Sequence, residues 1–222
     1  GELQARRAFA AAAEAAQREA GTAARTRQCG SCGFVHEEFS FICRSCGGVM
    51  EADYGCTTHF ALLGLPAEFE VNPSQADQAY KDLQRKLHPD NFAQAGAEQL
   101  ELAQAHSARL NEAIAVLRSP LRRAGYWMEL NGVRVLAEDQ RMEDAETMME
   151  VMEVSEEIAE AREQREVDRL AEQNAAKVRS VEQQLADVFR RREWEAARTL
   201  VERLQMLERL GERLNDWRAP AE

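Results

Sequence analysis

The chain has 222 residues, with 28 lysines and arginines against 39 aspartates and glutamates, and carries a formal net charge of −11. This length suits one long domain or two to three short ones. The acidic balance argues against a large nucleic-acid footprint, since phosphate binding depends on clustered Lys and Arg. No window approaches the roughly 18 uninterrupted apolar residues that a bilayer crossing needs, so we expect no membrane span. Five cysteines are too few, and odd in number, for the disulfide framework of a small secreted domain, and they favour metal binding.

The first 28 residues are rich in alanine and arginine and lack the apolar block and small-residue cleavage site of a secretory signal. Their five arginines are typical of an organellar presequence, whereas Glu2, Glu14 and Glu19 are unusual in one. We therefore expect residues 1–28 to be a disordered tail, with the remnant of a targeting segment as one interpretation.

Four of the five cysteines lie within residues 29–52, as two Cys-x-x-Cys pairs separated by ten residues. The four are Cys29, Cys32, Cys43 and Cys46. Such spacing is typical of a structural zinc site, in which four thiolates close the coordination shell and leave no position for catalysis. We expect one zinc ion in a small β-hairpin module. A redox role for either pair is the weaker alternative, because no βαβ pattern surrounds it.

Three neighbouring residues are interpreted as lying outside the metal site. Cys56 is expected to be a small buried residue, as most isolated cysteines are. His36 and His59 could each replace a ligand, but four suitably spaced cysteines leave no need for them, and we treat both as ordinary polar residues.

Helical periodicity begins at Asn72, a good N-cap, and at Pro73, whose missing N–H costs nothing in a first turn. The helix is expected to end near Leu87, because His88 precedes Pro89 and the residue before a proline disfavours helix. A second helix with apolar or small residues at alternating steps of three and four is expected to pack antiparallel on the first. Its seam consists of Leu100, Ala103, Ser107, Leu110, Ile114 and Leu117.

Further helices are predicted downstream. A short one begins at Pro120 and stops at Asn131-Gly132. Residues 139–218 contain no proline and one glycine, and a three-helix bundle is the simplest way to bury their apolar positions. The expected inward positions of the first bundle helix are Met142, Ala145, Met149, Met152 and Ala159.

The tripeptide His88-Pro89-Asp90 lies in the loop of the helical hairpin, directly after a basic stretch. This arrangement, with residues 59–65 as a first helix, resembles the J-domain of co-chaperones for the heat-shock-70 class of ATP-driven chaperones. The resemblance covers roughly residues 54–118 and implies a chaperone-binding site. The residues concerned are Lys81, Arg85, Lys86, His88, Pro89 and Asp90. Lys81 and Arg85 are four residues apart, so they share a helix face and form a cationic patch that would steer a negatively charged partner.

Residues 120–132 and 148–158 resemble the HscB family of J-proteins, which extends the likeness over residues 54–218. The resemblance implies a co-chaperone that stimulates the ATPase of its heat-shock-70 partner and delivers an iron–sulfur cluster scaffold protein of the IscU type to it. It also implies a J-domain with a short connecting helix over residues 54–132 and a bundle over residues 139–218. A zinc module ahead of the J-domain is similar to eukaryotic members, which implies the mitochondrial matrix, with the cytosol as a second location.

In that family the scaffold docks on an apolar and acidic face of the bundle. The matching residues are Met148, Met149, Met152, Glu153, Glu156, Glu160 and Met206. Family members usually have leucine at two of the first three positions and an aromatic residue at the last. Residues 138–172 also hold fourteen acidic residues against four arginines, which favours such a face independently. The alternative is that Met149 and Met152 belong to the bundle core.

The sequence therefore predicts a mainly α protein with a zinc-bound β-hairpin module, a J-domain hairpin and a three-helix bundle. No catalytic constellation is evident, so we expect a co-chaperone and not an enzyme. Two other functions stay open: a general J-protein for unfolded clients, and a zinc-ribbon adaptor that binds nucleic acid. The role of the zinc module is open too, with stabilisation, a homodimer contact and binding of another assembly factor as alternatives.

Overall fold

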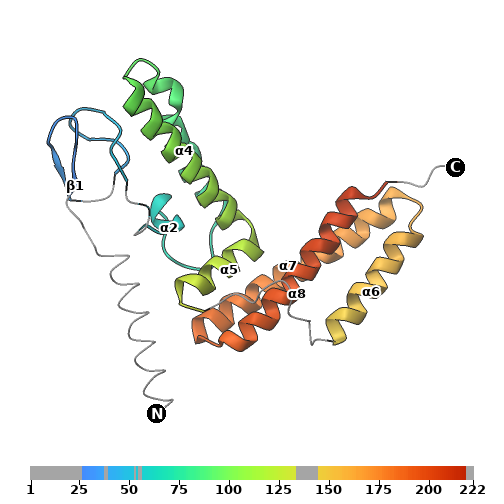
Figure 1. Ribbon diagram of the computed structural model, residues 1–222. Coiled ribbons are helices and arrows are strands. Elements are labelled where there is room, and N and C mark those ends of the chain that lie inside the picture. Colours follow the sequence, from blue (N-terminus) through green and yellow to red (C-terminus); the bar gives the residue numbers. More distant parts are fainter. Residues whose placement is uncertain (1–26, 38–39, 53, 55–56, 134–144, 219–222) are drawn as a thin grey trace, which may run out of the picture. The chain divides into compact units, whose positions relative to one another are not determined.

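The computed structural model describes residues 27–37, 40–52, 54, 57–133 and 145–218 (Figure 1). Cys56, Met142 and most of the predicted tail lie outside the described residues. The chain divides into two compact units, residues 1–119 and residues 120–222. No helix within the described ranges is long and apolar enough to cross a membrane. The predicted class, mainly helical with a small cysteine module, is confirmed.

The cysteine module is built from two tight turns. Strand β1 (Arg27–Gln28) pairs antiparallel with β2 (Val35–His36), and an isolated bridge joins Ile42 to Val49. Each turn closes in the same way, because Gly33 N–H donates to the Cys29 carbonyl at 2.8 Å and Gly47 N–H to the Cys43 carbonyl at 2.9 Å. Both glycines have positive φ, 72° and 75°, which a residue with a Cβ atom adopts only at a cost. Glycine after each Cys-x-x-Cys pair thus allows the turn that presents the thiols.

Two helices of the first unit begin at side-chain caps. Helix α2 (His59–Leu62) is capped by Thr58, and α3 (Pro73–Leu87) by Asn72, whose side chain accepts the Gln75 N–H at 3.2 Å. The end of α3 at Leu87 is as predicted, since His88 is extended with ψ of 129°. Helix α2 begins at His59, as the expected helix over residues 59–65 does, but it ends at Leu62, because the chain turns at Gly64, where φ is 65°.

The long hairpin joins α3 through the 3₁₀ helix η2 (Pro89–Phe92) to α4 (Ala97–Arg118). Its interior is apolar, with Leu87, Leu110 and Leu117 almost completely buried. A polar seam runs beside it, in which Tyr80 and Gln84 both donate to Asn111 Oδ1 at 2.7 Å. The predicted antiparallel packing therefore combines a buried leucine ladder with fixed side-chain hydrogen bonds.

The second unit contains α5 (Pro120–Leu130), α6 (Ala145–Glu160), α7 (Gln164–Arg191) and α8 (Trp194–Asp216). Helices α7 and α8 form a long antiparallel pair, and α6 packs against them (Figure 1). A capping box of Glu163 and Glu166 begins α7, and Arg192 with a φ of 56° ends it. The sequence predicts three helices over residues 139–218, and the described part of that range contains three, α6, α7 and α8.

The connecting helix α5 packs with the bundle. Its Arg123 is buried and pairs with Glu182 of α7 at 2.8 Å, and its Leu121 N–H donates to Glu208 of α8 at 3.4 Å. The sequence groups this helix with the J-domain, whereas its contacts place it in the unit that begins at residue 120.

Helix α6 packs on the bundle through a different face from the one predicted. Ala145, Met149, Met152 and Ala159 are exposed, whereas Thr147 and Ile158 are buried. Glu150 also points to the bundle, where it pairs with Lys177 at 2.8 Å and Arg203 at 3.0 Å. The prediction that the methionines face the core is therefore wrong. Both faces of α6 carry apolar residues at helical spacing, so periodicity alone cannot choose between them.

We expect Glu182→Ala to lower the free energy of unfolding by about 2 to 3 kcal/mol, because it leaves the buried Arg123 guanidinium without its carboxylate. Asp187→Ala is the control, since it breaks an exposed pair with Arg190 and should cost less than about 1 kcal/mol. Urea unfolding followed by circular dichroism measures both. Equal losses for the two variants would contradict a structural role for the Arg123 pair.

Candidate metal centre and protein-binding surfaces

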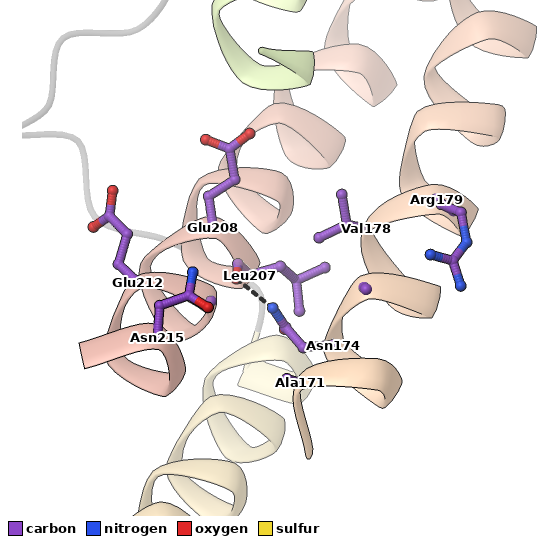
Figure 2. Close-up of a pocket in the computed structure, with 10 residues that line it drawn as sticks. Ala171, Asn174, Val178, Arg179, Leu207, Glu208, Glu212 and Asn215 are labelled. Atoms are coloured by element: carbon purple, nitrogen blue, oxygen red, sulfur yellow. Dashed lines mark hydrogen bonds between the residues drawn. The ribbon is translucent and has the colours of Figure 1, made fainter. Parts of the chain in front are cut away.

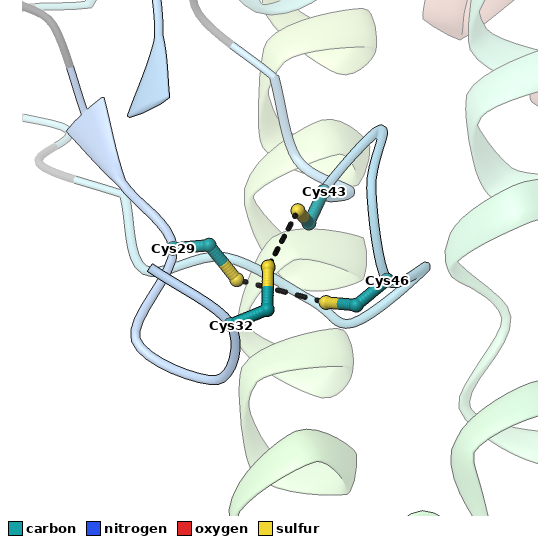
Figure 3. A group of neighbouring side chains, drawn as sticks. All are labelled: Cys29, Cys32, Cys43 and Cys46. Carbon is teal, nitrogen blue, oxygen red and sulfur yellow. Dashed lines mark hydrogen bonds between the residues drawn. The ribbon is translucent and has the colours of Figure 1, made fainter. Parts of the chain in front are cut away.

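The four predicted cysteine ligands meet at one point (Figure 3). All four Sγ atoms lie within 4.8 Å of one another, with 3.7 Å between Cys29 and Cys46 and 3.6 Å between Cys32 and Cys43. Four sulfurs bound tetrahedrally at about 2.3 Å from one ion would stand about 3.8 Å apart. The cluster therefore fits a single metal ion held by four thiolates.

The electrostatics of the cluster suit a cation. The Cys32 amide, assisted by that of Ser31, outweighs burial and lowers the pKa of the Cys29 thiol to about 6. The Gly48 amide lowers the pKa of Cys46, but contacts with the other thiols, Cys32 first, outweigh it and raise the pKa to about 11. Four adjacent thiols cannot all ionise without compensation. A bound cation supplies that compensation and favours the thiolate form of every ligand.

His36 belongs to the surroundings of the metal centre, which corrects its interpretation as an ordinary polar residue. Its side chain is buried, and Nε2 lies 3.4 Å from the Cys43 sulfur. The Ser45 N–H points to the same sulfur at 3.4 Å. An imidazole N–H can stabilise a thiolate there without replacing a ligand. In the sequence, only its position between the two Cys-x-x-Cys pairs indicates that His36 lies near the thiols.

The cysteine module is docked on helix α4 by side chains that sequence reasoning missed. The Gln99 side chain pairs with the backbone of Val49 as a neighbouring strand would. Its Oε1 accepts the Val49 N–H at 2.6 Å, and its Nε2 donates to the Val49 carbonyl at 3.1 Å. Seven residues further along α4, His106 Nε2 lies 2.7 Å from the Met50 carbonyl oxygen. The Phe41 ring packs 4.9 Å from the His106 ring, centroid to centroid. Helix α4 and the cysteine module are therefore one structure.

His106 is only 1 % exposed and is held as a neutral imidazole. Burial lowers its pKa, opposed in part by the hydrogen bond to Met50. Nε2–H donates to that carbonyl, which leaves Nδ1 to accept from the Tyr54 hydroxyl. The Arg109 guanidinium lies over the Tyr54 ring, 5.5 Å from its centroid. Protonation of Nδ1 would therefore bury a positive charge and end the hydrogen bond that this nitrogen accepts from the Tyr54 hydroxyl.

This arrangement gives a pH dependence with a defined sign. The pKa of folded His106 is below the unfolded value of about 6.5, so its stabilising contribution is complete above that pH and declines as the pH falls toward the folded pKa. We expect the melting temperature of the wild type to fall between about pH 7 and pH 5 more than that of His106→Phe, whose side chain cannot titrate. Parallel pH slopes in calorimetry would contradict this role.

Removal of one ligand tests the metal centre. Cys43 is almost fully buried in the cluster, so we expect Cys43→Ser to lose bound metal and to melt at a lower temperature. Cys56→Ser is the matched control and should retain the metal, because the four other cysteines complete a coordination shell. Elemental analysis of both proteins measures the metal content. Full occupancy in Cys43→Ser would exclude the four-thiolate site.

The His88-Pro89-Asp90 corner is exposed and held in one conformation. The His88 and Asp90 side chains are 57 % and 89 % exposed. His88 Nδ1 accepts the Asp90 N–H at 3.3 Å and lies 3.5 Å from the Asp90 carboxylate. The residues that follow hold the corner in place. Asn91 Nδ2 donates to the carbonyl of Arg85 at 2.9 Å, and the Phe92 side chain is buried. The corner is thus presented to solvent on an ordered support.

The basic residues that precede the corner share one exposed region of α3. Lys81, Arg85 and Lys86 are all exposed, as predicted for a surface patch. Arg85 also pairs with Asp82 at 3.1 Å, and hydrogen bonding from Gln78, together with the Arg85 charge, outweighs partial burial and lowers the pKa of Asp82. Among the described residues Lys81 and Lys86 form no ion pair, whereas the charge of Arg85 is partly offset by Asp82.

The surface predicted for scaffold binding is apolar and acidic. Met148, Met149 and Met152 are 48 %, 62 % and 60 % exposed, and they are the only exposed large apolar side chains in the described part of the second unit. Exposed carboxylates follow on the same helix. These are Glu153, Glu156 and Glu160. Met206 is half-buried on α8, the helix against which α6 packs, so it is less accessible than the three methionines of α6.

Comparison with known proteins supports one family throughout. Residues 143–215 match the family described as "HSCB C-terminal oligomerisation domain". The chain is 30 % identical over 187 residues to an Arabidopsis thaliana protein, the iron–sulfur cluster co-chaperone protein HscB homolog, covering 84 % of this chain and 72 % of that one. A Cupriavidus taiwanensis co-chaperone protein HscB homolog is 44 % identical over 111 residues, which span 50 % of this chain and 63 % of the relative.

The fold agrees with a solved structure of the same kind. Human co-chaperone protein HscB superposes with a TM-score of 0.74 at 24 % identity, covering 85 % of this chain and 97 % of that one. A helical hairpin with an exposed His-Pro-Asp corner and a separate helical bundle together define a J-type co-chaperone. The chain belongs to the HscB family.

Proposed function

We propose that this protein stimulates the ATPase of a heat-shock-70 class chaperone and delivers an iron–sulfur cluster scaffold protein of the IscU type to it. The observation that carries the proposal is the exposed His88-Pro89-Asp90 corner in a chain of the HscB family. The name of the Arabidopsis relative, an iron–sulfur cluster co-chaperone, supports the same cellular process for this protein.

The chaperone would be engaged by α3 and the corner together. Lys81, Arg85 and Lys86 supply a local positive potential on an otherwise acidic chain, which speeds encounter with a negatively charged surface of the chaperone's nucleotide-binding domain. The ordered corner then presents the His88 imidazole and the Asp90 carboxylate without an entropy cost of ordering a loop. Its role is recognition, and ATP is hydrolysed in the chaperone.

The scaffold would be held by α6. Methionine side chains are flexible and polarizable, so Met148, Met149 and Met152 can adapt to an apolar surface. The exposed glutamates beside them add charge specificity toward basic residues. Delivery and ATPase stimulation then come from one molecule, so client binding is coupled to nucleotide turnover in the chaperone.

For the metal centre we infer zinc. Four thiolates at tetrahedral spacing suit this ion, and a closed shell gives it a structural role. Zinc would stabilise a module whose contacts through Val49 and Met50 reach α4, so metal loading would support the J-domain hairpin.

We also infer the mitochondrial matrix as the location. The four-cysteine module and the likeness to the Arabidopsis and human proteins support this inference. Import of the full-length precursor into isolated mitochondria tests it, and a precursor that stays accessible to added protease would contradict it.

Asp90→Asn tests the chaperone-binding site. The Asp90 side chain is 89 % exposed, so the change should leave the fold intact and abolish most of the stimulation of the chaperone's ATPase. Asp216→Asn removes the same charge from an exposed site on α8 and should stimulate normally. Steady-state ATP hydrolysis by the purified chaperone measures both, and full stimulation by Asp90→Asn would refute the J-domain function.

The double variant Met149→Ser, Met152→Ser tests scaffold binding. Loss of two exposed apolar contacts should weaken binding of the purified scaffold at least about tenfold, because a few central apolar residues carry most of an interface's energy. Val35→Ser, at an exposed apolar residue of the cysteine module, is the control and should bind normally. Titration calorimetry measures the affinities. Unchanged scaffold binding, or tight binding of denatured polypeptide instead, would favour a general J-protein.

A further inference from the structure

Glu150 joins α6 to both α7 and α8. Its Oε1 lies 2.8 Å from Lys177 Nζ on α7, and its Oε2 lies 3.0 Å from a guanidinium nitrogen of Arg203 on α8. The Glu150 side chain is 22 % exposed, so water and salt screen these contacts less than they would at an open surface. Among the described residues neither cation pairs with another carboxylate. Each oxygen of one carboxylate therefore takes a cation from a different helix.

The two cations stand on helices that are themselves joined. Asn174 Nδ2 on α7 donates to the Leu207 carbonyl on α8 at 2.8 Å, inside the groove between the two helices (Figure 2). This hydrogen bond lies about one helical turn from Lys177 along α7 and from Arg203 along α8. A Cβ atom at Gly211 would stand 3.3 Å from Asn174 Nδ2, so the helices approach closely here. The two cations are therefore at a fixed spacing when α6 packs against them.

The contact of Glu150 determines where the methionines of α6 point. An α-helix has 3.6 residues per turn, so a residue two positions further on lies about 200° around the helix. Met152 occupies that position and is 60 % exposed. Met149 lies on the same flank of the helix and is 62 % exposed. With Glu150 directed at the bundle, both methionines face away from it.

Apolar packing alone does not select this orientation of α6. The inward face carries Thr147 and Ile158, which are buried, and Val154, which is half-buried. The outward face carries Met149 and Met152. Burial of a valine, isoleucine or methionine side chain contributes a similar free energy, so the two faces differ little in their hydrophobic driving force. A polar contact that only one orientation makes can then decide between them.

We propose that Glu150 is a positioning residue for scaffold binding, which holds α6 with its methionines exposed by pairing with Lys177 and Arg203. The inference rests on the proposed function, because the scaffold is the partner that this surface would bind. Glu150 itself faces the bundle and would act without touching the scaffold. Without its carboxylate, α6 would turn its methionines toward the bundle, and the apolar part of the docking surface would be buried.

Glu150→Ala tests this role by two separate measurements on the full-length chain. We expect the purified scaffold to bind at least about tenfold more weakly. We also expect hydrogen peroxide to oxidise Met149 and Met152 at least about threefold more slowly, because both side chains would be shielded. Titration calorimetry measures the affinity, and peptide mass spectrometry measures the sulfoxide at each methionine. Met128 of α5 is 1 % exposed and is the internal reference, which should react slowly in both proteins.

Ser155→Ala is the matched control on the same helix. It removes the exposed hydrogen bond that Arg213 of α8 donates to Ser155 Oγ at 2.7 Å, and it should leave both measurements as in the wild type. Charge exchange separates positioning from a simple loss of negative charge. The triple variant Glu150→Lys, Lys177→Glu, Arg203→Glu again pairs α6 with both neighbouring helices, so it should recover the scaffold affinity and the oxidation rates of the wild type.

Scaffold binding that is unchanged in Glu150→Ala would overturn the proposal. So would faster oxidation of Met149 and Met152, because α6 would then have detached from the bundle instead of turning on it. A triple variant that stays as impaired as Glu150→Ala, or an equal effect of Ser155→Ala, would also contradict it. If the wild type does not bind the scaffold, the proposed function fails, whereas the oxidation rates still report how Glu150 orients α6.

Discussion

The packing surface of helix α4 is the constraint on which the N-terminal unit depends. Helices α2, α3 and η2 all pack on it, and the cysteine module is fixed to it through Gln99 and His106. The module buries little apolar surface of its own, mainly a cluster of Cys29, Cys43 and Met50. A segment of this size needs a cross-link or a neighbour to fold stably. Helix α4 is the neighbour, since it satisfies the polar groups of Val49 and Met50, and a metal ion held by the four thiols would be the cross-link.

The same helix supports the exposed corner, which lies in the loop just before its first turn. The side-chain amide of Asn91 donates hydrogen bonds to two carbonyl groups at the end of α3, and the burial of Phe92 fixes η2 against α4. His88 and Asp90 can then be exposed without being free to rearrange. Exposure and order together are what a recognition element requires, because a partner that binds it pays little conformational entropy.

The second unit separates its charges by helix face. On α6 the inward Glu150 is neutralised by Lys177 and Arg203, whereas the outward carboxylates and methionines remain available to a partner. A net charge of −11 is therefore not spread evenly, and the described structure leaves distinct surfaces for distinct partners.

The sequence by itself determined the local structure: the cap at Asn72, the helix end before Pro89, the four-cysteine spacing and the number of bundle helices. These features depend on neighbouring residues, so short-range rules predict them. Only the tertiary structure decided which face of α6 is buried, because Val154 and Ile158 compete with Met149 and Met152 at the same helical period, and Glu150 settles the choice by pairing across the bundle. It also decided the roles of His36, Gln99 and His106, whose partners are distant in sequence or defined only by the folded turns, and for which composition and spacing carry no signal.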